Sequence, residues 1–71
     1  MTLIELDELG KKYYNEHEYT KALNCYAQVF ANYPEIAMAY NNYAMILKAM
    51  GKPKLSYNFF KTAIDLAPDD K

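Results

Sequence analysis

The chain repeats itself at an interval of 34 residues, and this repeat constrains its fold more than any other feature. When the sequence is shifted by that interval, residues of similar size fall on one another, although few pairs are identical. The paired positions are Leu6 with Tyr40, Leu9 with Tyr43, Gly10 with Ala44, Tyr13 with Leu47, Ala22 with Ser56, Tyr26 with Phe60, Val29 with Ala63 and Pro34 with Pro68. Small residues allow helices to approach closely, and large ones fill the spaces between them. The repeat therefore predicts two structural units with the same packing geometry.

Both copies of the repeat contain two stretches with apolar residues at helical spacing. The first expected helix begins after Thr2 and fades over 15–18, and the second covers 19–32. The third is expected over 35–50, and the fourth runs from Pro53 until Pro68. In each stretch apolar residues recur at i, i+3 and i+4, as on one face of an amphipathic helix. The short connections favour antiparallel neighbours, and no alternating pattern indicates a strand, so we predict an all-α fold.

Residues with defined roles at helix ends mark these boundaries. Thr2 and Glu5 fit a capping box, in which the side chain of each residue binds the backbone N–H of the other. Pro34 cannot continue the helix that precedes it. Gly51 suits a helix C-terminus because glycine adopts positive φ without a Cβ penalty. His17 occupies the matching place in the first copy, and we expect it to serve the same turn.

Composition and charge exclude several classes of function. An apolar content of 52% and an aromatic content of 15% argue against a disordered chain. Eight basic and nine acidic residues give a net charge of −1, without the positive excess of a nucleic-acid-binding protein. No apolar run approaches the roughly 18 residues that span a membrane. The first residues lack the basic and apolar regions of a signal peptide, so we expect a cytoplasmic protein.

The sequence offers no set of residues suited to catalysis, metal binding or a cofactor. Its single histidine, His17, is expected in a turn, and its single cysteine, Cys25, is expected to be a free structural thiol. There is no Ser/His/Asp set, no phosphate-binding loop and no cluster with metal-ligand spacing. We therefore predict a protein that is not an enzyme and that uses neither a metal nor another cofactor.

The repeat resembles that of the tetratricopeptide family, whose pattern places an aromatic, Leu-Gly, Tyr, Ala, Phe and Pro at fixed offsets over 34 residues. The matching residues are Leu6, Leu9, Gly10, Tyr13, Ala22, Tyr26 and Pro34 in the first copy, and Tyr40, Tyr43, Ala44, Leu47, Ser56, Phe60 and Pro68 in the second. The resemblance implies a single domain over 1–71, with one repeat over about 3–36 and another over about 37–70. It also implies two antiparallel helix-turn-helix units, stacked as a short right-handed α-solenoid with the first helix of each unit on the inner surface.

The resemblance further implies a protein–protein interaction module that docks a peptide or a partner helix on its concave face. The candidate binding residues are those of the first helix in each unit that the core does not use: Tyr14, Lys11, Met38, Asn41, Asn42, Met45 and Lys48. Met38 and Met45 suit adaptable apolar contacts, and the asparagines can bind a peptide backbone. The family subgroup that clamps the C-terminal carboxylate of chaperones is a poor match. Asn42 fits that clamp, but Asp7 stands where a lysine is expected and Lys11 where an asparagine is expected.

The last expected helix carries more apolar residues than one neighbouring helix can cover. These residues are Leu55, Tyr57, Phe59, Ile64 and Leu66. Repeat arrays normally cover such a terminal surface with a helix whose outer face is polar. Three alternatives follow: two copies stack through this helix, a partner protein covers it, or the chain is a piece of a longer array. The alternative function is thus an assembly subunit that associates through its last helix, either with itself or with a partner.

Overall fold

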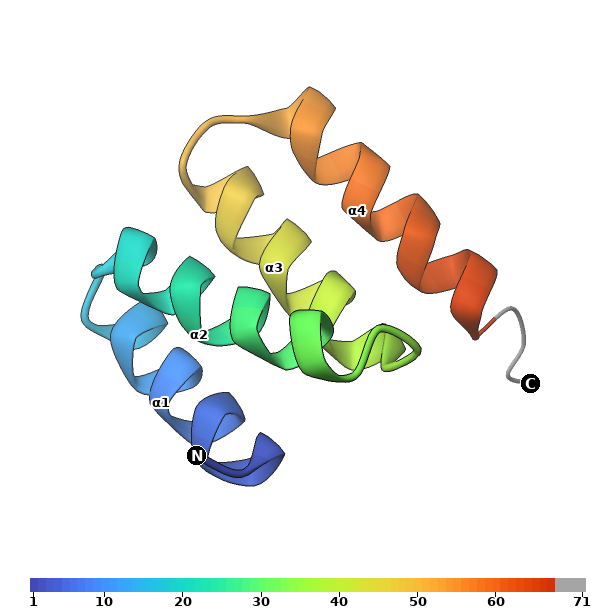
Figure 1. Cartoon of the computed structure of the whole chain (residues 1–71). Coiled ribbons are helices and arrows are strands. Elements are labelled where there is room, and N and C mark those ends of the chain that lie inside the picture. The colour runs from blue at the N-terminus through green and yellow to red at the C-terminus, as the bar shows by residue number, and fades with distance from the viewer. Residues whose placement is uncertain (68–71) are drawn as a thin grey trace.

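The computed structural model describes residues 1–67, and within them the chain forms four α-helices and no strand. The helices are α1 (Leu3–Asn15), α2 (Tyr19–Asn32), α3 (Ala37–Ala49) and α4 (Pro53–Leu66). Each helix packs on the next one along the chain, and the chain reverses direction at every turn (Figure 1). The predicted all-α fold is therefore confirmed. Pro68, the expected end of the fourth helix, lies outside the described residues.

The helix ends follow the predicted signals, with one exception. The backbone N–H of Thr2 donates to the Glu5 carboxylate at 2.8 Å, and the backbone N–H of Glu5 donates to the Thr2 hydroxyl at 3.1 Å. These hydrogen bonds complete the capping box and lower the pKa of Glu5. The exception is α3, expected from residue 35 but observed from Ala37. The backbone N–H of Ile36 donates to the Tyr33 carbonyl at 3.1 Å and closes a turn. Because of this turn, α3 begins two residues later than predicted.

The turns after α1 and α3 are copies of one another. His17 has a φ of 63° and Gly51 a φ of 81°, so both adopt the left-handed conformation. Beyond them, the Glu18 N–H donates to the Tyr13 carbonyl at 2.8 Å and the Lys52 N–H to the Leu47 carbonyl at 3.0 Å. This six-residue closure is the Schellman arrangement. The expected turn role of His17 is confirmed, and the repeat extends to the backbone geometry of the turns.

The buried core joins α1, α2 and α3 in two clusters. The first contains Leu6, Cys25, Val29 and Ala39, and the second contains Ala22, Tyr26 and Ile46. Cys25 is a free thiol, and burial raises its pKa. The sequence did not identify Ile46 as a core residue, although only 1% of it is exposed. α4 contributes only Ser56 and Ala63 as buried residues, both of them small.

Small residues bring the two helices of each unit close together at equivalent places. A Cβ atom on Gly10 would lie 2.5 Å from Cε2 of Tyr26, so the Tyr26 ring can lie against α1 only because residue 10 is glycine. In the second unit the Ser56 hydroxyl donates to the Ala44 carbonyl at 2.8 Å. The size classes of the repeat therefore correspond to real close approaches between helices.

An aromatic cluster connects α2 with α3 and α4. The Phe30 ring stacks on Tyr40 at a centroid distance of 4.7 Å and an interplanar angle of 9°, and it meets Tyr43 edge-on at 5.2 Å. Phe59 lies 4.6 Å from Tyr43 and 6.0 Å from Phe30. Phe59 is thus half-buried within the molecule. It is less open than the sequence predicted, because part of its ring contacts Tyr43 and Phe30; its predicted role in self-association stays a prediction.

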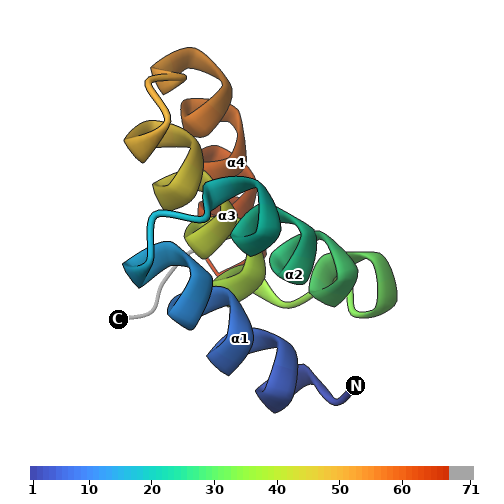
Figure 2. The ribbon, with the colours of Figure 1, turned by 90° about the vertical axis from the view of Figure 1, so that its left-hand side faces the viewer.

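Seen from the α1 side, the helices do not lie in one flat layer, because α3 and α4 are rotated relative to α1 and α2 (Figure 2).

The described part of the chain contains no helix with the length and apolar content needed to cross a membrane.

Candidate functional site

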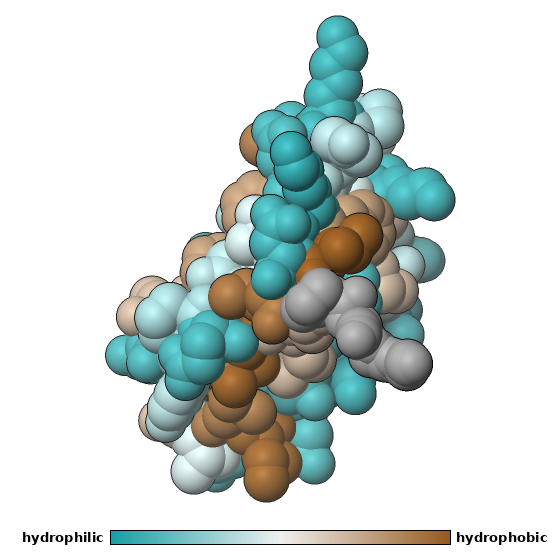
Figure 3. All heavy atoms as spheres, turned by 90° about the vertical axis from the view of Figure 1, so that its right-hand side faces the viewer, coloured by the Kyte–Doolittle hydropathy of each residue, from teal (hydrophilic) through white to brown (hydrophobic). Residues whose placement is uncertain are grey.

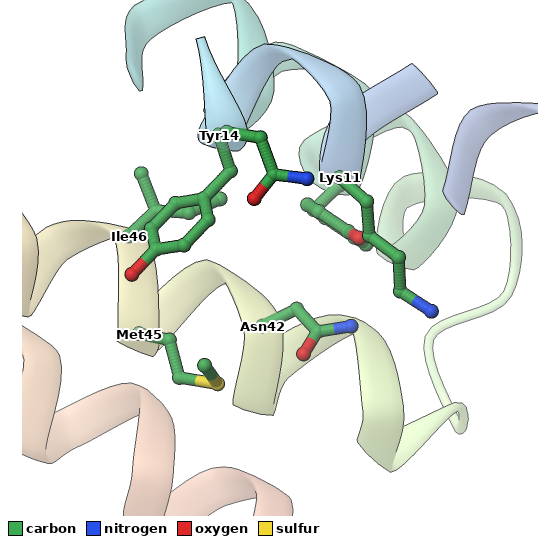
Figure 4. A pocket seen from close by; sticks show the side chains of 7 residues that line it. Lys11, Tyr14, Asn42, Met45 and Ile46 are labelled. Carbon is green, nitrogen blue, oxygen red and sulfur yellow. The ribbon is translucent and has the colours of Figure 1, made fainter. Parts of the chain in front are cut away.

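A pocket of about 220 Å³ lies between α1 and α3 (Figure 4). Its lining residues are Lys11, Tyr14, Asn15, Tyr26, Asn42, Met45 and Ile46. Figure 4 shows Tyr14 reaching from α1 toward the Met45 side chain of α3, with Asn42 opposite Lys11. The floor is apolar and the rim carries one ammonium group and two amides.

Helical spacing assembles this pocket from two matching triplets. Lys11, Tyr14 and Asn15 lie at i, i+3 and i+4 on α1, and the second triplet, Asn42, Met45 and Ile46, has the same spacing on α3. Four of the residues predicted for partner binding, Lys11, Tyr14, Asn42 and Met45, are therefore brought together.

Sequence reasoning missed three residues of the pocket. Asn15 and Ile46 were not considered, and Tyr26 was assigned only to the core. Counting four residues on from Lys11 and from Asn42 would have found Asn15 and Ile46, because positions i and i+4 lie on the same face of a helix. Tyr26 reaches the pocket from α2, which no spacing rule on the inner helices could reveal.

The hydroxyl of Tyr26, at the pocket floor, is hydrogen-bonded to α1. It donates to the Asp7 carboxylate at 2.8 Å and lies 3.1 Å from the Asp7 carbonyl oxygen. The same carboxylate pairs with the Lys11 ammonium at 3.4 Å, although the Lys11 side chain is 65% exposed. Burial raises the pKa of Tyr26, and the hydrogen bond to Asp7 and its negative charge add to the increase. Asp7 thus fixes the Tyr26 ring and holds Lys11 at the rim.

The raised pKa of Tyr26 predicts a loss of stability at alkaline pH. The protonated Tyr26 hydroxyl stabilises the folded chain fully below about pH 10, which is the pKa of a tyrosine in the unfolded chain. Above that pH the unfolded tyrosine ionises before the folded one, so the free energy of unfolding falls. We expect the wild type to lose about 1 kcal/mol more than Tyr26→Phe between pH 9 and pH 11, measured by urea denaturation. Equal losses in both proteins would show that Tyr26 keeps its proton no more tightly when folded. Cys25 is present in both, so its titration cancels.

The remaining predicted inner-face residues lie beside shallower hollows. Met38 and Asn41 border one between α3 and α4, together with Phe60, Ala63 and Ile64. Lys48 borders another with Tyr14, Met45, Ala49 and Phe60. The predicted surface therefore runs along α3, and the middle part of that helix forms the pocket with Lys11, Tyr14 and Asn15 of α1.

The exposed apolar residues of α4 form a second candidate surface. The exposed fractions are 46% for Leu55, 65% for Tyr57, 62% for Ile64 and 40% for Leu66. Figure 3, which shows the face on the right-hand side of Figure 1, has apolar side chains exposed between hydrophilic ones. Leu55 and Leu66 lie about 180° around the helix from Tyr57 and Ile64, at roughly 100° per residue. Four of the five residues predicted on the last helix are thus exposed, on two different sides.

Among residues 1–67 no group of three histidine, cysteine or acidic side chains is placed to hold a metal ion. A comparison of the chain with models of known families, with curated proteins and with solved structures found no match. The candidate sites therefore rest on the geometry of this molecule alone.

Proposed function

We propose that the chain is a protein–protein interaction module of the tetratricopeptide type, which docks a peptide or a partner helix on the face formed by α1 and α3. In this proposal the two helix pairs stack as a short right-handed α-solenoid in the cytoplasm, where the Cys25 thiol stays reduced. The proposal involves no catalysis and no cofactor. The observation that carries it is the pocket between α1 and α3, which is lined by triplets of the same helical spacing on the first helix of each repeat.

The size and lining of the pocket suit one side chain of a bound peptide. Its volume of about 220 Å³ is below the roughly 300–1,000 Å³ of typical small-molecule sites. Ile46 and the Tyr14 ring offer an apolar contact, and Met45, which is 43% exposed, can adapt to different shapes. Asn42 and Asn15 at the rim each offer an amide donor and acceptor to a peptide backbone. We infer that an extended peptide inserts an aliphatic or aromatic side chain between Tyr14 and Met45.

Peptide selection tests this proposal. Random dodecapeptides displayed on phage are selected against the immobilised chain, and the affinity of selected peptides is then measured for variants. We expect Met45→Asp to weaken binding by about tenfold or more, because the charge replaces a central apolar contact. Tyr57→Ser is the matched control, because it removes an exposed apolar side chain outside the pocket. If selected peptides lose affinity with Tyr57→Ser and keep it with Met45→Asp, the inner face is not the binding site.

A further inference from the structure

The 34-residue repeat gives α4 a face whose counterpart on α2 is covered by another helix. Leu23, Tyr26 and Phe30 of α2 correspond to Tyr57, Phe60 and Ile64 of α4. We call this second set the α4 flank. On α2, Phe30 stacks on Tyr40 and meets Tyr43 edge-on. Tyr26 packs in a core cluster with Ile46. The molecule therefore shows how a helix covers this face one repeat earlier.

On α4 the same face is open. Tyr57 is 65% exposed and Ile64 is 62% exposed, while Phe60 is half-buried. Beside them lies a hollow of about 360 Å³ between α3 and α4, bordered by Ala63 and Ala67. The corresponding residues in the first repeat are the larger Val29 and Tyr33. A helix packed on the α4 flank could therefore carry larger side chains than those with which α3 packs on α2.

A second copy of this chain cannot cover the α4 flank in the way that α3 covers α2. The helix that would occupy that place is α1 of the second copy, in which Glu5 and Lys12 correspond to Ala39 and Ile46. Ala39 and Ile46 are 0% and 1% exposed. Stacking in the same register would therefore bury a carboxylate and an ammonium against apolar residues, at a cost of several kcal/mol for each unpaired charge.

Two lysines border the α4 flank and indicate the charge of its partner. Lys54 and Lys61 lie three residues before Tyr57 and Ile64, so each is a neighbour of one of them on the helix surface. Both lysines are exposed, and neither is within ion-pair distance of a carboxylate among residues 1–67. The corresponding residues of α2 are the uncharged Thr20 and Ala27. Pairing two copies through their α4 flanks would bring these lysines together, which disfavours a symmetric dimer.

We propose that the α4 flank docks an amphipathic helix of another protein, with large apolar residues in its central stripe and acidic residues at its edge. The apolar stripe contacts Tyr57, Phe60 and Ile64, and the acidic edge pairs with Lys54 and Lys61. This surface adjoins the pocket between α1 and α3, because Phe60 borders a hollow with Tyr14 and Met45, but no α4 residue lines the pocket itself. The proposal does not depend on peptide binding in that pocket.

Two designed peptides with the length of residues 35–50 test the proposal. Both keep Ala39, Tyr40, Tyr43 and Ile46 at their α3 spacing; one carries glutamate and alanine elsewhere, and the other lysine and alanine. Binding to the chain is measured by fluorescence anisotropy and mapped by backbone amide chemical shifts. We expect the acidic peptide to bind roughly three- to tenfold more tightly than the basic one, with the difference shrinking as salt is added. The shifts should fall on α4 rather than on the α1–α3 pocket.

Matched variants on opposite sides of α4 complete the test. Ile64→Ser should weaken binding of the acidic peptide by about tenfold, whereas Leu66→Ser should leave it within about twofold. Both residues are exposed, so both variants should fold, and circular dichroism checks this. The absence of binding, or equal effects of the two variants, would overturn the proposal. Light scattering over a hundredfold dilution series of the free chain adds one more outcome: a dimer that Ile64→Ser abolishes would make a second copy the occupant instead.

Discussion

Tyr26→Ala should leave the chain largely unfolded at 25 °C. Tyr26 is the largest of the fully buried side chains, and it contacts α1 through Gly10 and α3 through the cluster with Ile46. Replacing a buried aromatic residue by alanine costs about 3–5 kcal/mol. A single core in a chain of this size rarely supplies more than about 3–5 kcal/mol. The loss therefore equals the whole stability of the domain, and far-ultraviolet circular dichroism should show little helix.

Two conservative variants separate the contributions of the ring and the hydroxyl. Tyr26→Phe keeps the ring and loses only the hydrogen bond to Asp7, at a cost of about 0.5–1.5 kcal/mol. Gly10→Ala keeps Tyr26 but places a methyl group against its ring, which should cost about 1–3 kcal/mol despite the better helix propensity of alanine. A cooperative Tyr26→Ala protein within about 1 kcal/mol of wild type would place the centre of the core elsewhere.

The fold was predictable where local chemistry decides the structure. Thr2 and Glu5 determine the start of α1, and Pro53 and Gly51 mark the turn before α4, because caps and turns involve only neighbouring residues. The start of α3 was placed too early because Ile36 offers no side-chain cap. The hydrogen bond between Ile36 and Tyr33 determines where α3 begins, and no local sequence signal predicts this hydrogen bond.

The candidate site was predictable only in part, because its residues come from neighbouring helices. Tyr14 and Met45 were found by removing the expected core residues from the inner helices. Ile46 was missed because α3 is apolar on most sides, so periodicity does not tell which residue faces which neighbour. The ring contacts that half-bury Phe59 were not predicted, for a similar reason. α4 has apolar residues on both sides of its buried row, and only the position of Phe30 shows which side is covered.

Phe30→Ala should loosen α4 more than it loosens the rest of the molecule. α4 buries only two small residues of its own, and its aromatic contacts are those of Phe59, whose ring lies 4.6 Å from Tyr43 and 6.0 Å from Phe30. The substitution also removes the stacking on Tyr40 and the edge-on contact with Tyr43. Aromatic pairs contribute about 0.5–1.5 kcal/mol each beyond burial, so we expect a total loss of about 2–3 kcal/mol.

Native-state hydrogen exchange would measure this loss helix by helix. We expect amides of α4 in Phe30→Ala to exchange through a local opening, at a lower free energy than amides of α1 and α2, whose own core clusters remain. Tyr33→Ala is the control, because Tyr33 is 42% exposed and follows the same helix. A double-mutant cycle with Phe59→Ala should give a coupling energy of about 0.5–1.5 kcal/mol. A uniform loss of protection in all helices would instead mean that α4 unfolds only with the whole domain. The aromatic cluster would then stabilise all four helices equally and would not specifically stabilise the packing of α4.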